Sequence, residues 1–117
     1  MIRGLVAGLI GVVVSGTVLA AQAPDPVKVA AGQKLYVAQN CSECHQIKGA
    51  GGKLSTPLDG VSTKLSAADL KMWLTDPATM EAKLPKKPVM LMSTYMKTHK
   101  LTDADADALV AYLQSLK

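Results

Sequence analysis

The stretch Cys41-Ser42-Glu43-Cys44-His45 decides how the rest of this chain is interpreted. It holds the only two cysteines of the sequence, three positions apart, with a histidine directly after the second. C-x-x-C-H is the spacing of covalent c-type haem attachment. Each thiol can form a thioether with one vinyl group of the porphyrin, and the imidazole can bind the iron. The motif therefore predicts one haem c held by Cys41 and Cys44, with His45 as the proximal iron ligand.

Three other interpretations use the same residues. A thioredoxin-like dithiol is expected in a βαβ context, which the sequence does not indicate. A zinc site needs further ligands, and the only other cysteine or histidine is His99. A disulfide between Cys41 and Cys44 would suit an exported protein, but it closes too short a loop to stabilise much and leaves His45 without a role. Haem attachment is the interpretation that accounts for all three residues.

The first 21 residues have the pattern of a secretory signal peptide. Met1-Ile2-Arg3 is a short positive start, Gly4 to Ala21 is apolar and uncharged, and small residues allow cleavage after Ala20 or Ala21. An uncleaved membrane anchor is the alternative, because the apolar run is barely long enough to span a bilayer. We therefore expect a signal peptide over 1–21, a linker over 22–26 and one domain over 27–117, in the periplasm or otherwise exported.

The composition indicates a small domain that depends on a cofactor for its core. The chain contains no Phe, one Trp and three Tyr, and a domain of this size buries only about two-thirds of its unfolded surface. We expect a buried haem to supply the missing apolar volume and the apo chain to be poorly folded.

The formal net charge is +4. The lysines are dispersed and have no aromatic residues among them, which argues against nucleic-acid binding.

Helical patterns cover much of the domain and no strand pattern is present, so we expect an all-α fold. The first helix is predicted from Val27 to about Gln39, with Pro26 in its first turn. Gly32 inside it indicates either simple tolerance or a close approach by another backbone. The helix is predicted from the approximate i, i+3, i+4 spacing of its apolar residues Val27, Ala30, Ala31, Leu35 and Ala38.

Two further helices carry N-cap signals. Ser66 is predicted to cap a helix that ends before Asp76-Pro77. Thr102 and Asp105 form a capping box for a last helix that reaches about Leu116. The buried face of this last helix is predicted to consist of Leu109, Val110, Tyr112, Leu113 and Leu116.

The segments between these helices are expected to be mostly loop. Residues 46–60 include a glycine-rich run at 49–52, which we expect to let the backbone approach the haem edge. A short helix is predicted from Ala78 to Lys83, and Val89 to Lys100 is predicted to be a methionine-rich loop.

The order of these features resembles the class I cytochrome c family over roughly Val27 to Lys117. The motifs that carry the resemblance are Gly32-x-x-Leu35-Tyr36, the C-x-x-C-H sequence, Thr56-Pro57-Leu58-x-Gly60, a Met-bearing loop and Leu109-Val110-Ala111-Tyr112-Leu113. The resemblance implies the cytochrome c fold, with three to five helices around one covalently bound haem. It implies that the first and last helices cross with Gly32 against Tyr112. It also implies that Pro57 offers its backbone carbonyl to the ring of His45.

The resemblance further implies that a methionine sulfur is the sixth iron ligand. Met92-Ser93-Thr94-Tyr95 is similar to the Met-Pro-x-aromatic pattern of the family, with Ser in place of Pro. Met92 is therefore the preferred ligand, and Tyr95 is expected beside the cofactor. Met96 is the alternative, and Met90, His99 or an open sixth position remain further possibilities.

The functional expectation is a monohaem carrier that shuttles single electrons between redox partners outside the cytoplasm and is not itself an enzyme. The alternative is a haem-containing subunit, or a small-ligand-binding cytochrome, of a larger oxidoreductase complex.

Trp73 is expected either to donate its indole N–H to a haem propionate or to pack in the core. Five lysines are expected either to steer an acidic partner to the haem edge or simply to be solvated. They are Lys83, Lys86, Lys87, Lys97 and Lys100. Membrane association is expected only if the N-terminal segment is uncleaved.

Overall fold

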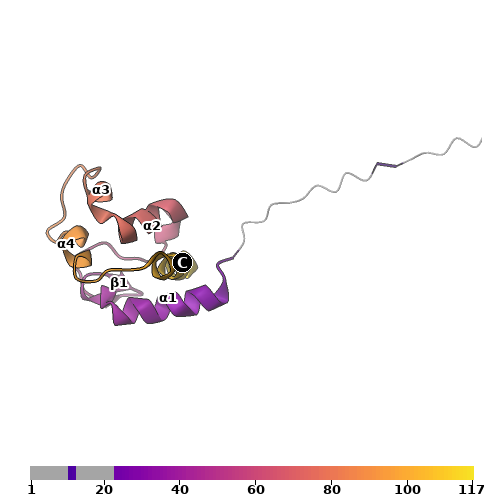
Figure 1. Ribbon diagram of the computed structural model, residues 1–117, viewed down its shortest axis with the longest axis horizontal. Helices are drawn as coiled ribbons and strands as arrows, with labels where there is room; N and C mark the ends of the chain where they lie inside the picture. Colours follow the sequence, from indigo (N-terminus) through magenta and orange to yellow (C-terminus); the bar gives the residue numbers. More distant parts are fainter. Residues whose placement is uncertain (1–10, 13–22) are drawn as a thin grey trace, which may run out of the picture.

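The computed structural model describes residues 11–12 and 23–117, so the expected signal peptide lies almost wholly outside the described residues (Figure 1). The described part is helical, which confirms the all-α expectation. Its helices are α1 (Pro26–Ala38), α2 (Ala67–Thr75), α3 (Pro77–Glu81), α4 (Met92–Met96) and α5 (Asp103–Ser115). Two 3₁₀ turns (Cys41–Glu43 and Val61–Thr63) and a pair of two-residue strands, β1 (Gln46–Ile47) and β2 (Ala50–Gly51), complete it.

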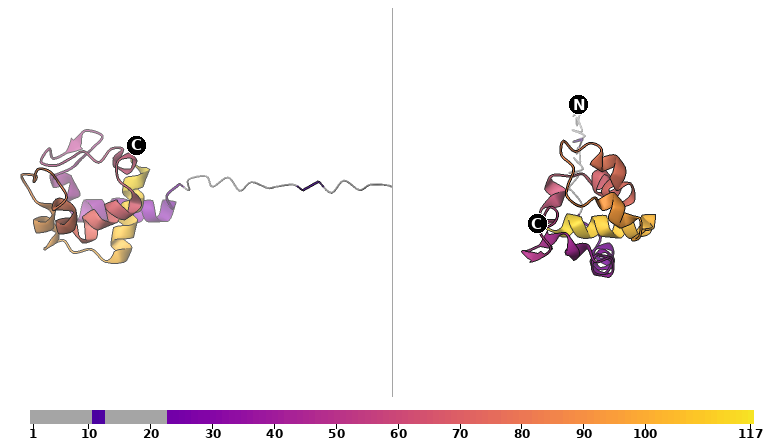
Figure 2. Two further views of the ribbon diagram at one scale, coloured as in Figure 1. Left: turned by 90° about the horizontal axis from the view of Figure 1, so that it is seen from above. Right: turned by 90° about the vertical axis from the view of Figure 1, so that its left-hand side faces the viewer.

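Helices α1 and α5 cross, and the crossing is the centre of the fold (Figure 2, left). A Cβ built at Gly32 would collide with the backbone carbonyl of Ala108 and would lie 2.7 Å from the Cβ of Tyr112. Only glycine lets the two backbones approach this closely. The expected contact of Gly32 with Tyr112 is confirmed. The rings of Tyr36 and Tyr112 pack beside it, tilted by 59° with centroids 5.7 Å apart.

The predicted first helix is confirmed as α1, but most of the apolar residues whose spacing predicted it are not buried, and only Leu35 among them is half-buried. Val27 is 76% exposed, and Ala30, Ala31 and Ala38 are exposed as well. The buried residues of α1 are instead Gly32 and Tyr36. The reason is that α1 packs mainly where α5 crosses it, so burial follows that crossing and not the distribution of small apolar residues.

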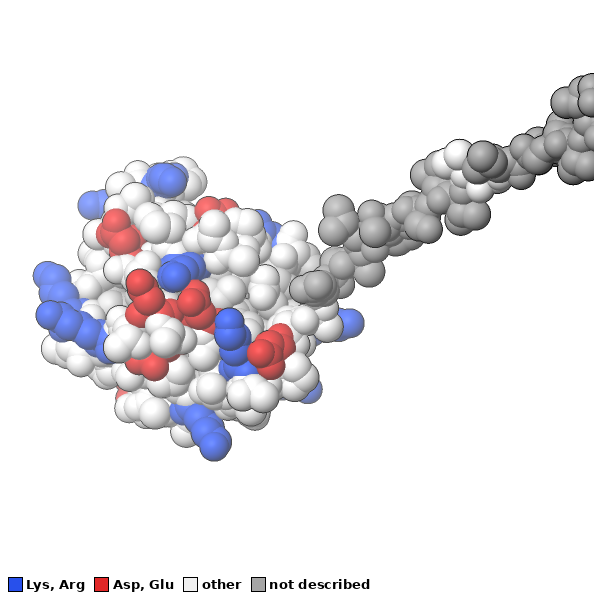
Figure 3. Space-filling model, turned by 45° about the vertical axis from the view of Figure 1, so that its right-hand side comes forward, with Lys and Arg blue, Asp and Glu red and all other residues white. Residues whose placement is uncertain are grey.

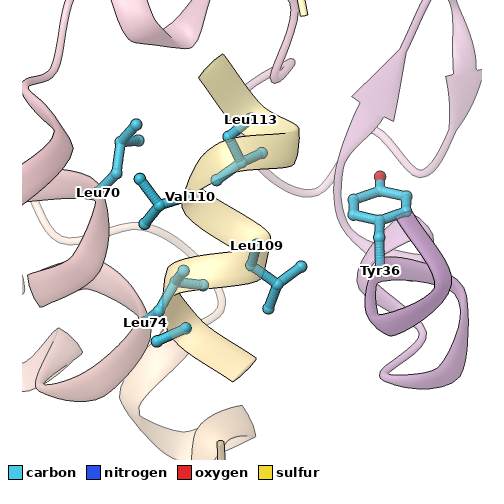
Figure 4. Close-up of a cluster of buried hydrophobic side chains, with 7 residues drawn as sticks. Tyr36, Leu70, Leu74, Leu109, Val110 and Leu113 are labelled. Atoms are coloured by element: carbon cyan, nitrogen blue, oxygen red, sulfur yellow. The ribbon is translucent and has the colours of Figure 1, made fainter. Parts of the chain in front are cut away.

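The hydrophobic core lies on both sides of α5 (Figure 4). Leu70 and Leu74 of α2 point toward one side of α5, and Tyr36 of α1 lies on the other. Full burial of one such leucine stabilises the fold by about 1.5–3 kcal/mol. The α5 residues in this cluster are Ala106, Leu109, Val110 and Leu113. Tyr112 and Leu116, which were expected to be buried, are half-buried at its edge.

Both predicted N-caps are confirmed. The Ser66 hydroxyl accepts from the backbone N–H of Asp69 at 3.1 Å. Thr102 and Asp105 exchange the two reciprocal bonds of a capping box at the start of α5, at 3.1 and 3.3 Å. These caps fix where α2 and α5 begin, and therefore how their apolar faces meet.

The middle of the chain is more ordered than the sequence indicated. Residues 46–60 contain the antiparallel pair β1–β2, whose turn places Lys48 and Gly49 at φ 51° and 78°. The short helix is Pro77–Glu81, a little earlier than predicted. The segment predicted as a methionine-rich loop contains α4, which packs against α3. Within the described residues, no helix is both long and apolar enough to cross a membrane.

Candidate haem-binding site

The cysteine motif begins directly after α1, through a sharp turn of the backbone. Asn40 has φ 52° and ψ 37°, in the left-handed region that asparagine tolerates better than most residues. The motif then winds back on itself, because the N–H groups of Cys44 and His45 both donate to the carbonyl of Cys41. Both cysteine thiols are free. One compact turn thus presents the two sulfurs and the imidazole together.

The glycine-rich hairpin is attached to the back of this motif. Gly52 donates its N–H to the carbonyl of Ser42 at 2.8 Å, and Ser55 donates to that of Cys44 at 2.9 Å. A Cβ on Gly51 or Gly52 would collide with a motif carbonyl, that of His45 or Glu43 respectively. These glycines do permit a close backbone approach. The neighbour that they approach is the cysteine motif, whereas the expected neighbour was the haem edge.

The ring of His45 is oriented by a backbone carbonyl. Its Nδ1 lies 2.7 Å from the carbonyl oxygen of Thr56. When Nδ1 carries the proton and donates it there, Nε2 is left with its lone pair for a metal. The expected acceptor was Pro57, so this assignment is corrected by one residue. The physical reason is that a residue before proline is restricted to extended backbone, which fixes the direction of the Thr56 carbonyl.

Beside His45 lies a cavity of about 470 Å³, which we call the main cavity. Its lining is predominantly apolar and includes Leu58, Val61, Leu70, Leu74 and Leu109. A side cavity of about 60 Å³ adjoins it and shares Cys41, His45 and Met92 with it. The volume of the main cavity is within the range of about 300–1,000 Å³ that is usual for cofactor pockets.

This donor set fits a covalently attached haem. Cys41 lines both cavities and Cys44 lines the side cavity, so both sulfurs border the same space as the His45 ring. The apolar walls suit a porphyrin face, and Met92 supplies a thioether to the same space. Soft sulfur and imidazole ligands are those that bind haem iron in electron-transfer proteins.

The thiol of Cys41 is unlike that of a dithiol oxidoreductase. Burial raises its pKa to about 11, and the neighbouring Cys44 adds to the rise, while a backbone hydrogen bond opposes it. Redox-active cysteines of that class have lowered pKa values, because the thiolate is the reactive form. Among the residues that the structure describes, no three His, Cys, Asp or Glu side chains gather to hold a metal ion.

The three candidate methionines have different surroundings. Met92 is half-buried, packs against the core and lines both cavities. Met90 also lines both cavities but is 51% exposed, and its sulfur lies 3.9 Å from that of Cys44. Met96 lines only the side cavity. The structure thus brings Met92 and Met90 to the main cavity and leaves Met96 beside it.

Trp73 and Tyr95 both border the candidate site. Trp73 is half-buried and lines the main cavity. Tyr95 lines the side cavity, but its hydroxyl donates to the carbonyl of Gln39 at 2.6 Å. The Tyr95 ring stacks on His99, with centroids 3.8 Å apart. His99, one of the further possibilities for the sixth ligand, is thus half-buried against Tyr95 and lines neither cavity.

Sequence reasoning missed one charged residue of the site. Glu81 is only 6% exposed and lines the main cavity. Its carboxylate accepts from the backbone N–H of Ser93 at 2.8 Å and from the Ser93 hydroxyl at 2.6 Å. Ser93 is the signal in the sequence that could have indicated this contact. It stands where the family pattern Met-Pro-x-aromatic has proline, and it has a backbone N–H and a hydroxyl that proline lacks and that can donate to a carboxylate.

The fold and the site together define a small all-α domain that attaches a haem covalently through C-x-x-C-H. The family model described as Cytochrome c matches residues 29–117, and the chain belongs to the cytochrome c family. Members of this family bind covalently attached haem c with its iron and act as haem-binding electron carriers, and this chain has one such attachment region, at Cys41 and Cys44. No curated protein and no solved structure matches the chain.

Proposed function

We propose that this protein is a monohaem cytochrome c that shuttles single electrons between redox partners outside the cytoplasm. The observation that carries the proposal is the placement of His45, with its Nδ1 on the Thr56 carbonyl, and Met92 around one apolar cavity. Haem supplies one-electron exchange at its iron when it is bound. The protein would supply covalent attachment through Cys41 and Cys44, His45 and Met92 as iron ligands and an apolar cavity, and it is not itself an enzyme.

The residues that hold the proximal side have separate tasks. Cys41 and Cys44 anchor the cofactor, so it cannot dissociate between partners. The bond from His45 to Thr56 fixes the ring tautomer and makes the imidazole a stronger donor. Because that acceptor is a backbone carbonyl, it would hold the ring in one orientation toward a bound iron.

Met92 is our choice for the sixth ligand. It lines the main cavity from the N-terminal end of α4, it is half-buried, and its neighbour Ser93 is tied to Glu81. Met90 stands in an exposed stretch, and Met96 faces only the side cavity. A thioether ligand raises the reduction potential compared with a second histidine.

The partner surface that we propose surrounds the mouth of the main cavity. Residues 82–90 are all exposed and contain three lysines and the apolar pair Val89 and Met90, which are 99% and 51% exposed. Lys83 and Lys64 line the cavity itself. We expect these lysines, with Lys97 and Lys100, to attract donor and acceptor proteins that have acidic surfaces. Figure 3 shows one face of the molecule, on which acidic and basic groups are interspersed.

Export is part of this proposal and rests on the N-terminal sequence. Cleavage of the signal segment would release the domain into the periplasm or another extracytoplasmic space, and retention of the segment would anchor it to the membrane. Edman sequencing of the exported protein distinguishes the two, because a cleaved chain begins after Ala20 or Ala21.

Spectra of the holoprotein in both oxidation states, with carbon monoxide titrations of the ferrous form, test the carrier function. We expect the weak far-red ferric band of methionine ligation and slow carbon monoxide binding. Both features should be lost in Met92→Ala and kept in the matched variants Met96→Ala and Met90→Ala. A high-spin ferric spectrum with rapid carbon monoxide binding would show an open sixth position and favour a small-ligand-binding cytochrome. Stable co-purification with an oxidoreductase would favour a permanent subunit.

A further inference from the structure

Glu81 is the one charged side chain that is buried among the residues the structure describes. Both of its carboxylate oxygens are occupied by a single residue: Oε1 accepts from the Ser93 N–H at 2.8 Å and Oε2 accepts from the Ser93 hydroxyl at 2.6 Å. A buried carboxylate is costly unless it is hydrogen-bonded. Here the two bonds satisfy it without a basic partner, since the one ion pair found among the described residues joins Lys71 to Asp107.

The pair joins two short helices that are separated in the chain by an exposed segment. Glu81 is the last residue of α3 and Ser93 is the second residue of α4. The chain between them is exposed from residue 82 to residue 90. A helix of five residues is too short to be stable by itself, so tertiary contacts must fix the start of α4.

We propose that Glu81 and Ser93 are positioning residues that hold the backbone at Met92 so that the methionine side chain stays directed into the main cavity. Ser93 follows Met92 directly, and the Glu81 side chain lines the same cavity as Met92. The exposed segment 82–90 can therefore move at a partner surface without carrying Met92 away from the iron. This inference rests on the proposed function, because it takes Met92 as the sixth ligand.

The expected size of the effect follows from the type of bond. Loss of a charge-assisted hydrogen bond at a buried site shifts a local equilibrium by roughly tenfold to a hundredfold. The equilibrium concerned is between a closed form, with Met92 in the cavity, and an open form with Met92 displaced. Ligands that compete with Met92 for the ferrous iron report this equilibrium directly.

The test measures carbon monoxide affinity of the ferrous holoprotein, the ferric methionine band and the reduction potential, with denaturant unfolding in parallel. Ser93→Ala removes one of the two bonds, and we expect a roughly tenfold gain in carbon monoxide affinity, a weaker band and a lower potential. Thr94→Ala is the matched control, because Thr94 is the exposed next residue of the same helix. Ser93→Thr keeps the hydroxyl and should restore most of the wild-type behaviour, and Glu81→Gln should change all three readouts in the same direction as Ser93→Ala.

The proposal is overturned if Ser93→Ala and Thr94→Ala have the same carbon monoxide affinity and band intensity. It is also overturned if Ser93→Ala only lowers the midpoint of global unfolding, because that is the result of a purely structural role. A wild-type holoprotein that lacks the methionine band and binds carbon monoxide as readily as Met92→Ala would overturn the carrier function together with this inference. A methionine-ligated wild type with an unaffected Ser93→Ala would overturn this inference alone.

Discussion

The hydroxyl of Tyr95 donates a hydrogen bond of 2.6 Å to the backbone carbonyl of Gln39. Tyr95 belongs to α4, and Gln39 closes α1 two residues before Cys41. This bond joins the helix that carries the proposed sixth ligand to the turn that leads into the haem motif. The two sides of the main cavity are therefore linked by a direct contact that does not involve the cofactor.

Tyr95→Phe should weaken this link while leaving the ring stacked on His99. We expect a loss of about 1 kcal/mol in the free energy of unfolding, together with faster carbon monoxide binding to the ferrous holoprotein. Tyr112→Phe serves as the control for removal of a half-buried tyrosine hydroxyl elsewhere. Equal carbon monoxide binding rates in the two variants would contradict the proposed link.

Gly32→Ala tests the crossing of α1 and α5. In an unobstructed helix this change stabilises by up to about 1 kcal/mol. At Gly32 the added methyl group meets the Ala108 carbonyl, so we expect the opposite sign, a loss of about 3 kcal/mol. Urea unfolding of the holoprotein measures it, with Ala31→Ser as a control on an exposed position of the same helix. A gain in stability would show that the helices do not touch at Gly32.

Pro57→Ala tests the contact between His45 and the Thr56 carbonyl. Without the following proline, Thr56 gains backbone freedom and the bond to Nδ1 weakens. A less electron-rich imidazole stabilises ferric iron less, so we expect the midpoint potential to rise by about 20–60 mV, where a tenfold change in relative affinity is about 59 mV for one electron. Voltammetry on the holoprotein measures the shift against Pro85→Ala, a proline in the exposed loop. An unchanged or lowered potential would count against this role of the carbonyl.

The features that the sequence predicted correctly have local causes. A cap depends on two residues three positions apart, which is why the residue pattern alone was enough to assign Ser66 and Thr102. The C-x-x-C-H motif likewise contains its chemistry in five consecutive residues. The contact of Gly32 with α5 came from the family resemblance, since a helical glycine alone does not identify its neighbour.

The features that the sequence did not predict depend on contacts between distant residues. The spacing of apolar residues in α1 did not identify its buried residues, because α5 packs against Gly32 and Tyr36 and leaves four apolar positions exposed. Helix α4 was missed because its start is held by Glu81, twelve positions before Ser93. The carbonyl facing His45 was misplaced by one residue, because the restraint from Pro57 acts on the residue before it.

Tyr36 makes the stability of the domain depend on pH in the alkaline range. Burial raises the pKa of Tyr36 from 10.0 to about 12. Between these two values the unfolded chain loses the phenolic proton while the folded chain keeps it, so the unfolded state binds fewer protons and stability falls as pH rises. One pKa unit corresponds to about 1.4 kcal/mol, and we expect a loss of up to about 2 kcal/mol between pH 10 and pH 12.

Tyr36→Phe should remove this part of the alkaline loss. The variant lacks the weak bond of 3.5 Å from the Tyr36 hydroxyl to the His45 carbonyl, so its stability near pH 7 should change little. The pKa of Tyr112 is also raised, mainly by burial, and Tyr112 is present in both proteins, so its contribution cancels in the comparison. Denaturant unfolding of the two holoproteins at stepped pH gives the difference directly. Parallel stability curves up to pH 12 would show that the hydroxyl of Tyr36 is not the group that titrates.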